Sequence, residues 1–165
     1  MTIVLTEAER AQLIDQYESG IVALEEAFRN APVEALHFHQ QPGEWSNQEI
    51  VCHCADAEIL GGVRVRMLAA EREALLVSID QDVWANTFAY ESLSAETALT
   101  LVRATRTHTA AILRLLPEQV WSNVGRHTET GPYSIGEWLT YWADHLHVHA
   151  EQIRQNVSQF ESRAL

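Results

Sequence analysis

Three capping boxes mark the places where helices begin, and they constrain the fold of this chain more than any other feature. Each box has a Ser or Thr three residues before a Glu, at Thr6–Glu9, Ser46–Glu49 and Ser134–Glu137. In this motif the Ser or Thr side chain caps the first turn of a helix, and the Glu side chain accepts a hydrogen bond from the backbone of the cap. Ser94 begins a weaker box, with Thr97 where Glu would be expected.

Each start opens a segment whose apolar residues recur at intervals of three and four. The predicted helices span about residues 6–29, 46–72, 94–116 and 134–158. This spacing places the apolar side chains of each helix on one buried face. No alternating run of four or more residues predicts a strand. Four amphipathic helices of similar length predict an all-α four-helix bundle.

The connections between these helices are rich in turn-forming residues. Residues 30–45 and 117–133 form two such links, and residues 73–93 form a third that is longer than a bundle needs. Loops of that length often act as the lids or rims of sites. A chain of 165 residues is long enough to bury about 70% of its unfolded surface. We therefore expect residues 1–165 to form a single domain.

The charge balance argues against two classes of partner. The chain has 23 Asp and Glu against 11 Lys and Arg, a formal net charge of -12, and no basic stripe. Such a chain repels phosphate groups, so we expect neither nucleic acid nor an anionic membrane surface as a partner. No apolar run approaches the ~18 residues that span a bilayer. The N-terminus also lacks the pattern of a secretory signal.

The two cysteines, Cys52 and Cys54, lie on either side of His53 in the second predicted helix. Their side chains would point about 200° apart on a helix, which is a poor geometry for a disulfide. We interpret them as free thiols, which are typical of a reducing compartment. The expected location is therefore the cytoplasm.

Three of the eight histidines have the spacing of a metal site. His145 and His149 are four residues apart on the fourth helix, where two imidazoles on one face can chelate one ion. Both follow the stripe of Trp138 and Trp142 and should point inward. His53 lies in the apolar stripe of the second helix, where an unpartnered imidazole would cost a few kcal/mol. Three ligands with open positions are typical of a catalytic metal.

Plainer interpretations exist for each histidine. A single pair at this spacing is a modest signal, and one histidine on an apolar face is more often a hydrogen-bonded core residue. We interpret His108 as a pocket or core residue in preference to a fourth ligand. We expect the others to be exposed, namely His37, His39, His127 and His147. Asp56 and Asp144 could accept hydrogen bonds from imidazoles, although a solvated carboxylate is the plainer interpretation of Asp56.

Several segments resemble a known family, the DinB-like (damage-inducible, YfiT-like) metalloenzymes. Its second-helix and fourth-helix signatures and its loop between the second and third helices are similar to residues 45–58, 131–139, 142–145, 149–153 and 80–85. The similarity spans most of the chain. Cys52 and Cys54 depart from the family pattern, which commonly has aliphatic residues beside the histidine.

The resemblance implies an up-up-down-down four-helix bundle with a metal bound by His53, His145 and His149. The metal varies among nickel, zinc and iron in the family, and many members are homodimers. Relatives include bacillithiol- and mycothiol-dependent transferases and isomerases. A low-molecular-weight thiol is therefore an implied second cofactor.

The leading functional hypothesis is a metal-dependent enzyme that acts on a small molecule, either as a thiol-dependent S-transferase or as a hydrolase. The metal would lower the pKa of a bound water or thiol. Four arginines could reach an anionic substrate, although most should lie at the surface: Arg64, Arg66, Arg103 and Arg106. No residue plainly serves as a general base. The alternatives are a non-catalytic metal- or ligand-binding dimer in a stress response and a bundle whose histidines bind nothing.

Overall fold

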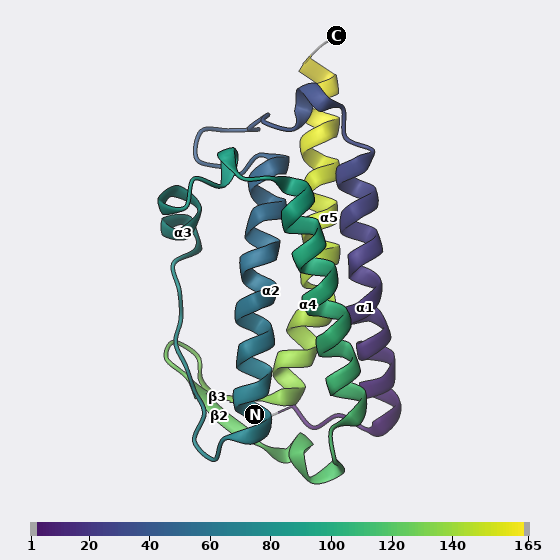
Figure 1. Cartoon of the computed structure of the whole chain (residues 1–165), viewed down its shortest axis with the longest axis vertical. Coiled ribbons are helices and arrows are strands. Elements are labelled where there is room, and N and C mark those ends of the chain that lie inside the picture. The colour runs from purple at the N-terminus through teal and green to yellow at the C-terminus, as the bar shows by residue number, and fades with distance from the viewer. Residues whose placement is uncertain (1–2, 164–165) are drawn as a thin grey trace.

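Four long helices lie side by side along the long axis of the molecule (Figure 1). The computed structural model describes residues 3–163. The long helices are α1 (Glu7–Arg29), α2 (Asn47–Ala70), α4 (Ala95–Leu115) and α5 (Ile135–Arg163), and a short α3 (Gln81–Thr87) lies apart from them. The predicted all-α four-helix bundle is confirmed.

The capping residues begin the helices where the sequence predicts. Ser46 Oγ accepts a hydrogen bond from the backbone N–H of Glu49 at 3.3 Å, and the Glu49 carboxylate accepts one from the backbone N–H of Ser46 at 2.8 Å. Equivalent reciprocal pairs join Thr6 to Glu9 and Ser134 to Glu137. The helix predicted for residues 134–158 is α5, which continues to Arg163 because no Gly or Pro follows residue 158 to end it.

The directions of the helices follow from the links. In Figure 1, α1 and α5 run upward and α2 and α4 run downward. The order along the chain is thus up, down, down, up, which differs from the order implied by the family resemblance. The links from α1 to α2 and from α4 to α5 reverse the chain, whereas the link from α2 to α4 runs back along the bundle. In cross-section, α1 contacts α5 and α4, and α2 also contacts both.

A small sheet closes the lower end of the bundle, where the sequence predicted no strand. It consists of β1 (Leu75–Leu76), β2 (Val124–His127) and β3 (Gly131–Ser134), in that order. β2 and β3 form an antiparallel hairpin, and β1 pairs with β2 in parallel. Gly131 has a φ of 81° at the end of the hairpin turn, a conformation that favours glycine. Strands of two and four residues are too short for an alternating pattern to reveal them.

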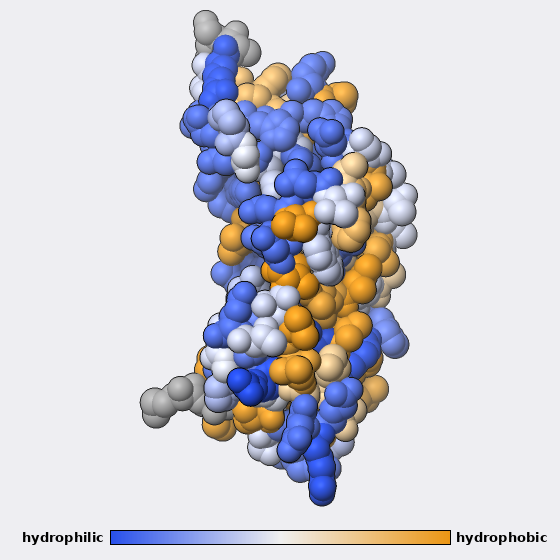
Figure 2. Space-filling view, turned by 90° about the vertical axis from the view of Figure 1, so that its left-hand side faces the viewer, coloured by the Kyte–Doolittle hydropathy of each residue, from blue (hydrophilic) through white to orange (hydrophobic). Residues whose placement is uncertain are grey.

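The link between α2 and α4 lies along the outer side of α2. It contains β1, α3 and a 3₁₀ turn at Tyr90–Ser92. Asp80 caps α3, since its carboxylate accepts hydrogen bonds from the backbone N–H groups of Asp82 and Val83, both at 3.0 Å. Figure 2 shows the side of the molecule that carries this link, where apolar side chains gather in a central band between hydrophilic ends. The link thus forms a wall beside the bundle, as its length suggested.

A buried polar network joins all four long helices. The guanidinium of Arg106 on α4 lies 2.8 Å from the carboxylate of Glu58 on α2. It also donates to the backbone carbonyls of Tyr17 on α1 and Trp142 on α5, each at 2.7 Å. The Tyr17 hydroxyl donates to the other oxygen of Glu58 at 2.9 Å. The side chains of Glu58 and Arg106 have no exposed surface, which corrects the expectation that Arg106 could reach a substrate.

This network lies between two apolar clusters. Along α1 the lower cluster includes Ile14 and the upper one Leu24, while along α5 the lower includes Leu139 and the upper Leu146. Gly20 of α1 lies against the guanidinium of Arg106, and a Cβ at this position would collide with it. The small residue therefore allows α1 to approach the buried charge closely.

Candidate metal centre

Three histidines from two helices converge beside the polar network. His53 comes from α2, and His145 and His149 come from successive turns of α5. One ring nitrogen from each lies within 4.8 Å of the others. The ring centroids are 4.6 Å apart for His145 and His149, 4.9 Å for His53 and His149, and 5.7 Å for His53 and His145. The sequence thus predicted correctly that these three side chains lie together.

The convergence follows from packing. His145 and His149 share one face of α5 because they are four residues apart, and that face packs against α2. Aromatic rings pack against two of the imidazoles. The ring centroids of Trp45 and His53 are 4.5 Å apart, and those of Trp142 and His145 are 4.8 Å apart. His53 and His145 are buried and His149 is half-buried.

The surroundings favour neutral imidazoles. Burial, with a smaller contribution from the nearby His149, lowers the pKa of His53 to about 3. Burial also lowers the pKa of His145 well below its ordinary value, helped by the two other histidines and by Arg106. The pKa of His149 is lowered by burial, although its hydrogen bond to Gln152 acts in the opposite direction. Neutral imidazoles are the form that binds metals.

The hydrogen bonds of these rings leave nitrogens free for a cation. His149 Nδ1 lies 2.9 Å from the side-chain oxygen of Gln152 and donates to it, so Nε2 keeps its lone pair. His145 Nδ1 is buried and has no hydrogen-bond partner among the described residues. A buried ring nitrogen without a partner is costly, and a cation held among the three rings would provide one. The donor set therefore fits a metal ion.

Neither of the two carboxylates that could have partnered the histidines forms a hydrogen bond to an imidazole within residues 3–163. Asp144 is exposed, and no hydrogen bond within residues 3–163 joins it to an imidazole. Asp56 instead accepts a hydrogen bond from the Tyr90 hydroxyl at 2.6 Å. Asp56 is half-buried one helical turn after His53, and the hydrogen bond from Tyr90 fixes the orientation of its carboxylate. The spacing of three residues from His53 was a signal for Asp56, but its partner on the distant 3₁₀ turn was not predictable.

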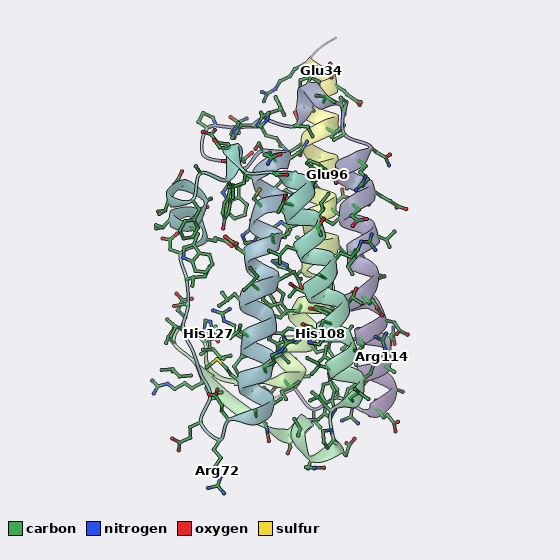
Figure 3. The ribbon with its side chains drawn as sticks, in the orientation of Figure 1. Glu34, Arg72, Glu96, His108, Arg114 and His127 are labelled. Atoms are coloured by element: carbon green, nitrogen blue, oxygen red, sulfur yellow. The ribbon has the colours of Figure 1, made fainter. Side chains whose placement is uncertain are left out.

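The remaining histidines divide in an unexpected way. His108 is exposed on α4, which corrects its interpretation as a core or pocket residue (Figure 3). His127 is half-buried on β2 and His147 is half-buried against α1, although both were expected to be exposed. His147 Nε2 lies 3.1 Å from the backbone carbonyl of Gln16. His37 and His39 are exposed as predicted.

A cavity of about 290 Å³ opens beside the histidines. Its walls are α2, α5, the link between α2 and α4, and the β2–β3 hairpin. Besides His53 and His145, its lining includes Asp56, Leu60, Arg64, Trp84, Tyr133 and Tyr141. A second hollow, of about 400 Å³, reaches His149 and is lined by residues that include Gln81, Gln152 and Asn156. The histidine cluster is therefore accessible, unlike a closed structural site.

The family of the chain follows from a comparison with known proteins. Residues 16–153 match the family model of the DinB superfamily. This chain belongs to the DinB superfamily. A provisionally named metal-dependent hydrolase of Oceanobacillus iheyensis is 24% identical over 145 residues, which are 86% of this chain and 84% of that protein.

Two solved structures resemble this chain in fold. YfiT from Bacillus subtilis, described as a metal-dependent hydrolase on provisional grounds and as an unusual four-helix bundle, aligns with a TM-score of 0.89 at 18% identity. That alignment covers 98% of this chain and 93% of YfiT. A mycothiol-dependent maleylpyruvate isomerase aligns with a TM-score of 0.71 at 12% identity, over 87% of this chain and 60% of the isomerase. At identities this low, the two alignments establish a shared fold and do not by themselves establish a shared function.

The length and polarity of the helices also bear on membranes. Among residues 3–163, no helix combines the length and the apolar character required to span a bilayer.

Proposed function

We propose that this member of the DinB superfamily is a metal-dependent enzyme that acts on a small organic molecule. His53, His145 and His149 would hold one divalent transition metal. The observation that carries the proposal is the convergence of three imidazoles, two of which line a cavity that a small molecule can enter. The names given to the Oceanobacillus protein and to YfiT agree with this function.

The donor set limits the choice of metal. Three imidazoles are ligands of borderline softness, which suit zinc, nickel and iron. A bound ion of this kind supplies Lewis acidity and a nucleophile near neutral pH. The lowered pKa values keep the three rings unprotonated, so no proton competes with the metal at neutral pH.

The first candidate reaction is hydrolysis, in which a proton must leave the attacking water. Asp56 is suited to accept it, because its carboxylate lines the cavity one helical turn from His53. The hydrogen bond from Tyr90 occupies one carboxylate oxygen and orients the other. Trp84 and Tyr133 line the same cavity. Asp56 thus fills the role of general base that the sequence alone left open.

The second candidate is transfer of a group to a low-molecular-weight thiol. The hollow beside His149 favours this reaction, since it would admit a polar second reactant to the histidines without displacing a substrate from the first cavity. A non-catalytic metal-binding protein would have no need of a cavity at the cluster. From the family resemblance and the sequence, we also propose a cytoplasmic homodimer that binds neither nucleic acid nor membranes.

The test of this proposal is catalysis by the metal-loaded protein and its dependence on Asp56. A panel of esters, amides and thioesters, each with and without an added thiol, is assayed after loading with zinc, nickel or iron. For the best substrate, we expect Asp56→Asn to lower kcat by about 100-fold or more, as for loss of a general base, with the metal content unchanged.

The matched control is Asp144→Asn, which removes an exposed carboxylate next to His145 and should keep full activity. Retention of activity by Asp56→Asn would exclude Asp56 as the base. If the metal-loaded protein turns over nothing in the panel, the non-catalytic alternative is favoured.

A further inference from the structure

Arg64 lines the cavity and forms no ion pair among the described residues. It is half-buried on α2, and its guanidinium donates to the backbone carbonyl of Val77 at 2.5 Å. Its Nε is buried and has no hydrogen-bond partner among the described residues. No carboxylate within residues 3–163 lies close enough to form an ion pair with it. Partial burial of a cation without an ion-pair partner costs desolvation free energy, although the chain has 23 acidic residues that could have supplied one.

The position of Arg64 gives the cavity two chemically different ends. His53, Ala57, Leu60 and Arg64 follow one another at intervals of four, three and four residues on the face of α2 that lines the cavity. Eleven residues separate the first from the last, which is about 16 Å along a helix axis. The histidine cluster thus lies at one end of the cavity and the guanidinium toward the other.

The wall between these ends is largely apolar. Ala57 and Leu60 on α2 face Trp84 of the link and Trp142 of α5 across the same cavity. Tyr133, Tyr141 and Glu129 lie close enough to Arg64 to raise its pKa. Burial lowers the pKa of Arg64, but arginine titrates so far above neutrality that the guanidinium stays charged. An apolar molecule with one anionic group would match this surface.

The geometry of a guanidinium selects the kind of anion. Its planar set of N–H donors matches a carboxylate, which can accept two parallel hydrogen bonds. Asp56 and Glu129 are the other charged residues that line the cavity, and both are negative. A single positive group next to Glu129 is suited to a monoanion, whereas a phosphate dianion would need more donors.

We propose that Arg64 is an anion-binding residue that recognises the carboxylate of the substrate, so that the substrates are organic acids with an apolar body. The free Nε would donate the hydrogen bond that it lacks. The choice of the reacting group rests on the function proposed above. Recognition of the carboxylate does not depend on that function. It takes place at the end of the cavity away from the histidines, and binding can be measured without turnover.

The test compares cinnamate with its neutral amide, cinnamamide, by calorimetric titration. The full-length protein is titrated as purified and again after removal of metal with a chelator, because a carboxylate could also bind a metal ion. We expect the parent to bind cinnamate about tenfold more tightly than cinnamamide in both states, as for one charge-assisted pair. In Arg64→Met the preference should vanish, while cinnamamide binding stays within about twofold of the parent value.

The control is Arg72→Met, since Arg72 is exposed near the end of α2 and points away from the bundle (Figure 3). It should keep the full preference. A preference that survives in Arg64→Met, or that disappears when the metal is removed from the parent, would overturn the proposal. So would a failure of the parent to bind cinnamate at millimolar concentration.

A second variant guards against a loosened fold, because Arg64→Met also removes the contact with Val77. Glu129→Gln leaves that contact untouched and removes a negative charge near the proposed carboxylate position. We expect cinnamate to bind severalfold more tightly to this variant and cinnamamide to bind as before. Unchanged or weaker binding of cinnamate would contradict the assignment. Metal content and hydrolysis are measured separately, so failure of the proposed function would be recognised independently.

Discussion

Replacing Arg106 with methionine is expected to lower the free energy of unfolding by about 3–5 kcal/mol, the usual cost of breaking a buried ion pair. The substitution leaves the Glu58 carboxylate buried without its counter-charge. It also leaves the carbonyls of Tyr17 and Trp142 without the donor that they share. Chemical denaturation with urea, followed by circular dichroism at 222 nm as is usual for helices, measures the change.

The matched control lies one turn away on the same helix. Arg103 pairs with Glu25 at the surface, and its side chain is 54% exposed. Arg103→Met should therefore cost no more than about 1 kcal/mol. The double variant Glu58→Leu with Arg106→Met removes both charges and should recover part of the lost stability. Equal costs for the two arginine variants would show that the buried pair has no special role in stability.

Binding of metal is expected to raise the stability of the protein strongly. A ligand that binds only the folded state, at a free concentration 1,000 times its Kd, stabilises by about 4.1 kcal/mol. For a chain of this size, that corresponds to a rise in Tm on the order of ten degrees. Thermal melts of the metal-free protein, with and without added zinc or nickel, measure the rise.

The histidine variants locate this effect. His145→Ala should lose nearly all of the rise in Tm, because the remaining two imidazoles come from different helices and chelate poorly. His108→Ala is the control, since His108 is exposed on α4 away from the cluster, and it should keep the full rise (Figure 3). A rise of equal size in both variants would place the metal elsewhere in the molecule.

The sequence predicted the features that depend on local patterns. Capping boxes located the helix starts at Thr6, Ser46 and Ser134, because a cap involves residues only three positions apart. The spacing of four between His145 and His149 placed both rings on one face of α5. His53 could be added because it lies among the apolar residues of its own helix, and that helix packs against α5.

Features that depend on contacts between distant segments were not predictable. Arg106 looked like a surface residue because its partner Glu58 lies on another helix, and only packing of all four helices brings the pair together. His127 was assigned to an exposed link because strands as short as β2 and β3 leave no recognisable pattern. Asp56 was noticed, but its partner Tyr90 is 34 residues away in sequence.

The central claim is that three histidines hold one metal ion, and elemental analysis of the purified, untagged protein tests it most directly. The parent and the variants His53→Ala and His108→Ala are analysed side by side after incubation with nickel, zinc and iron salts. We expect about one equivalent of a transition metal in the parent and in His108→Ala, and almost none in His53→Ala. No metal in the parent, or as much metal in His53→Ala as in the parent, would contradict the account.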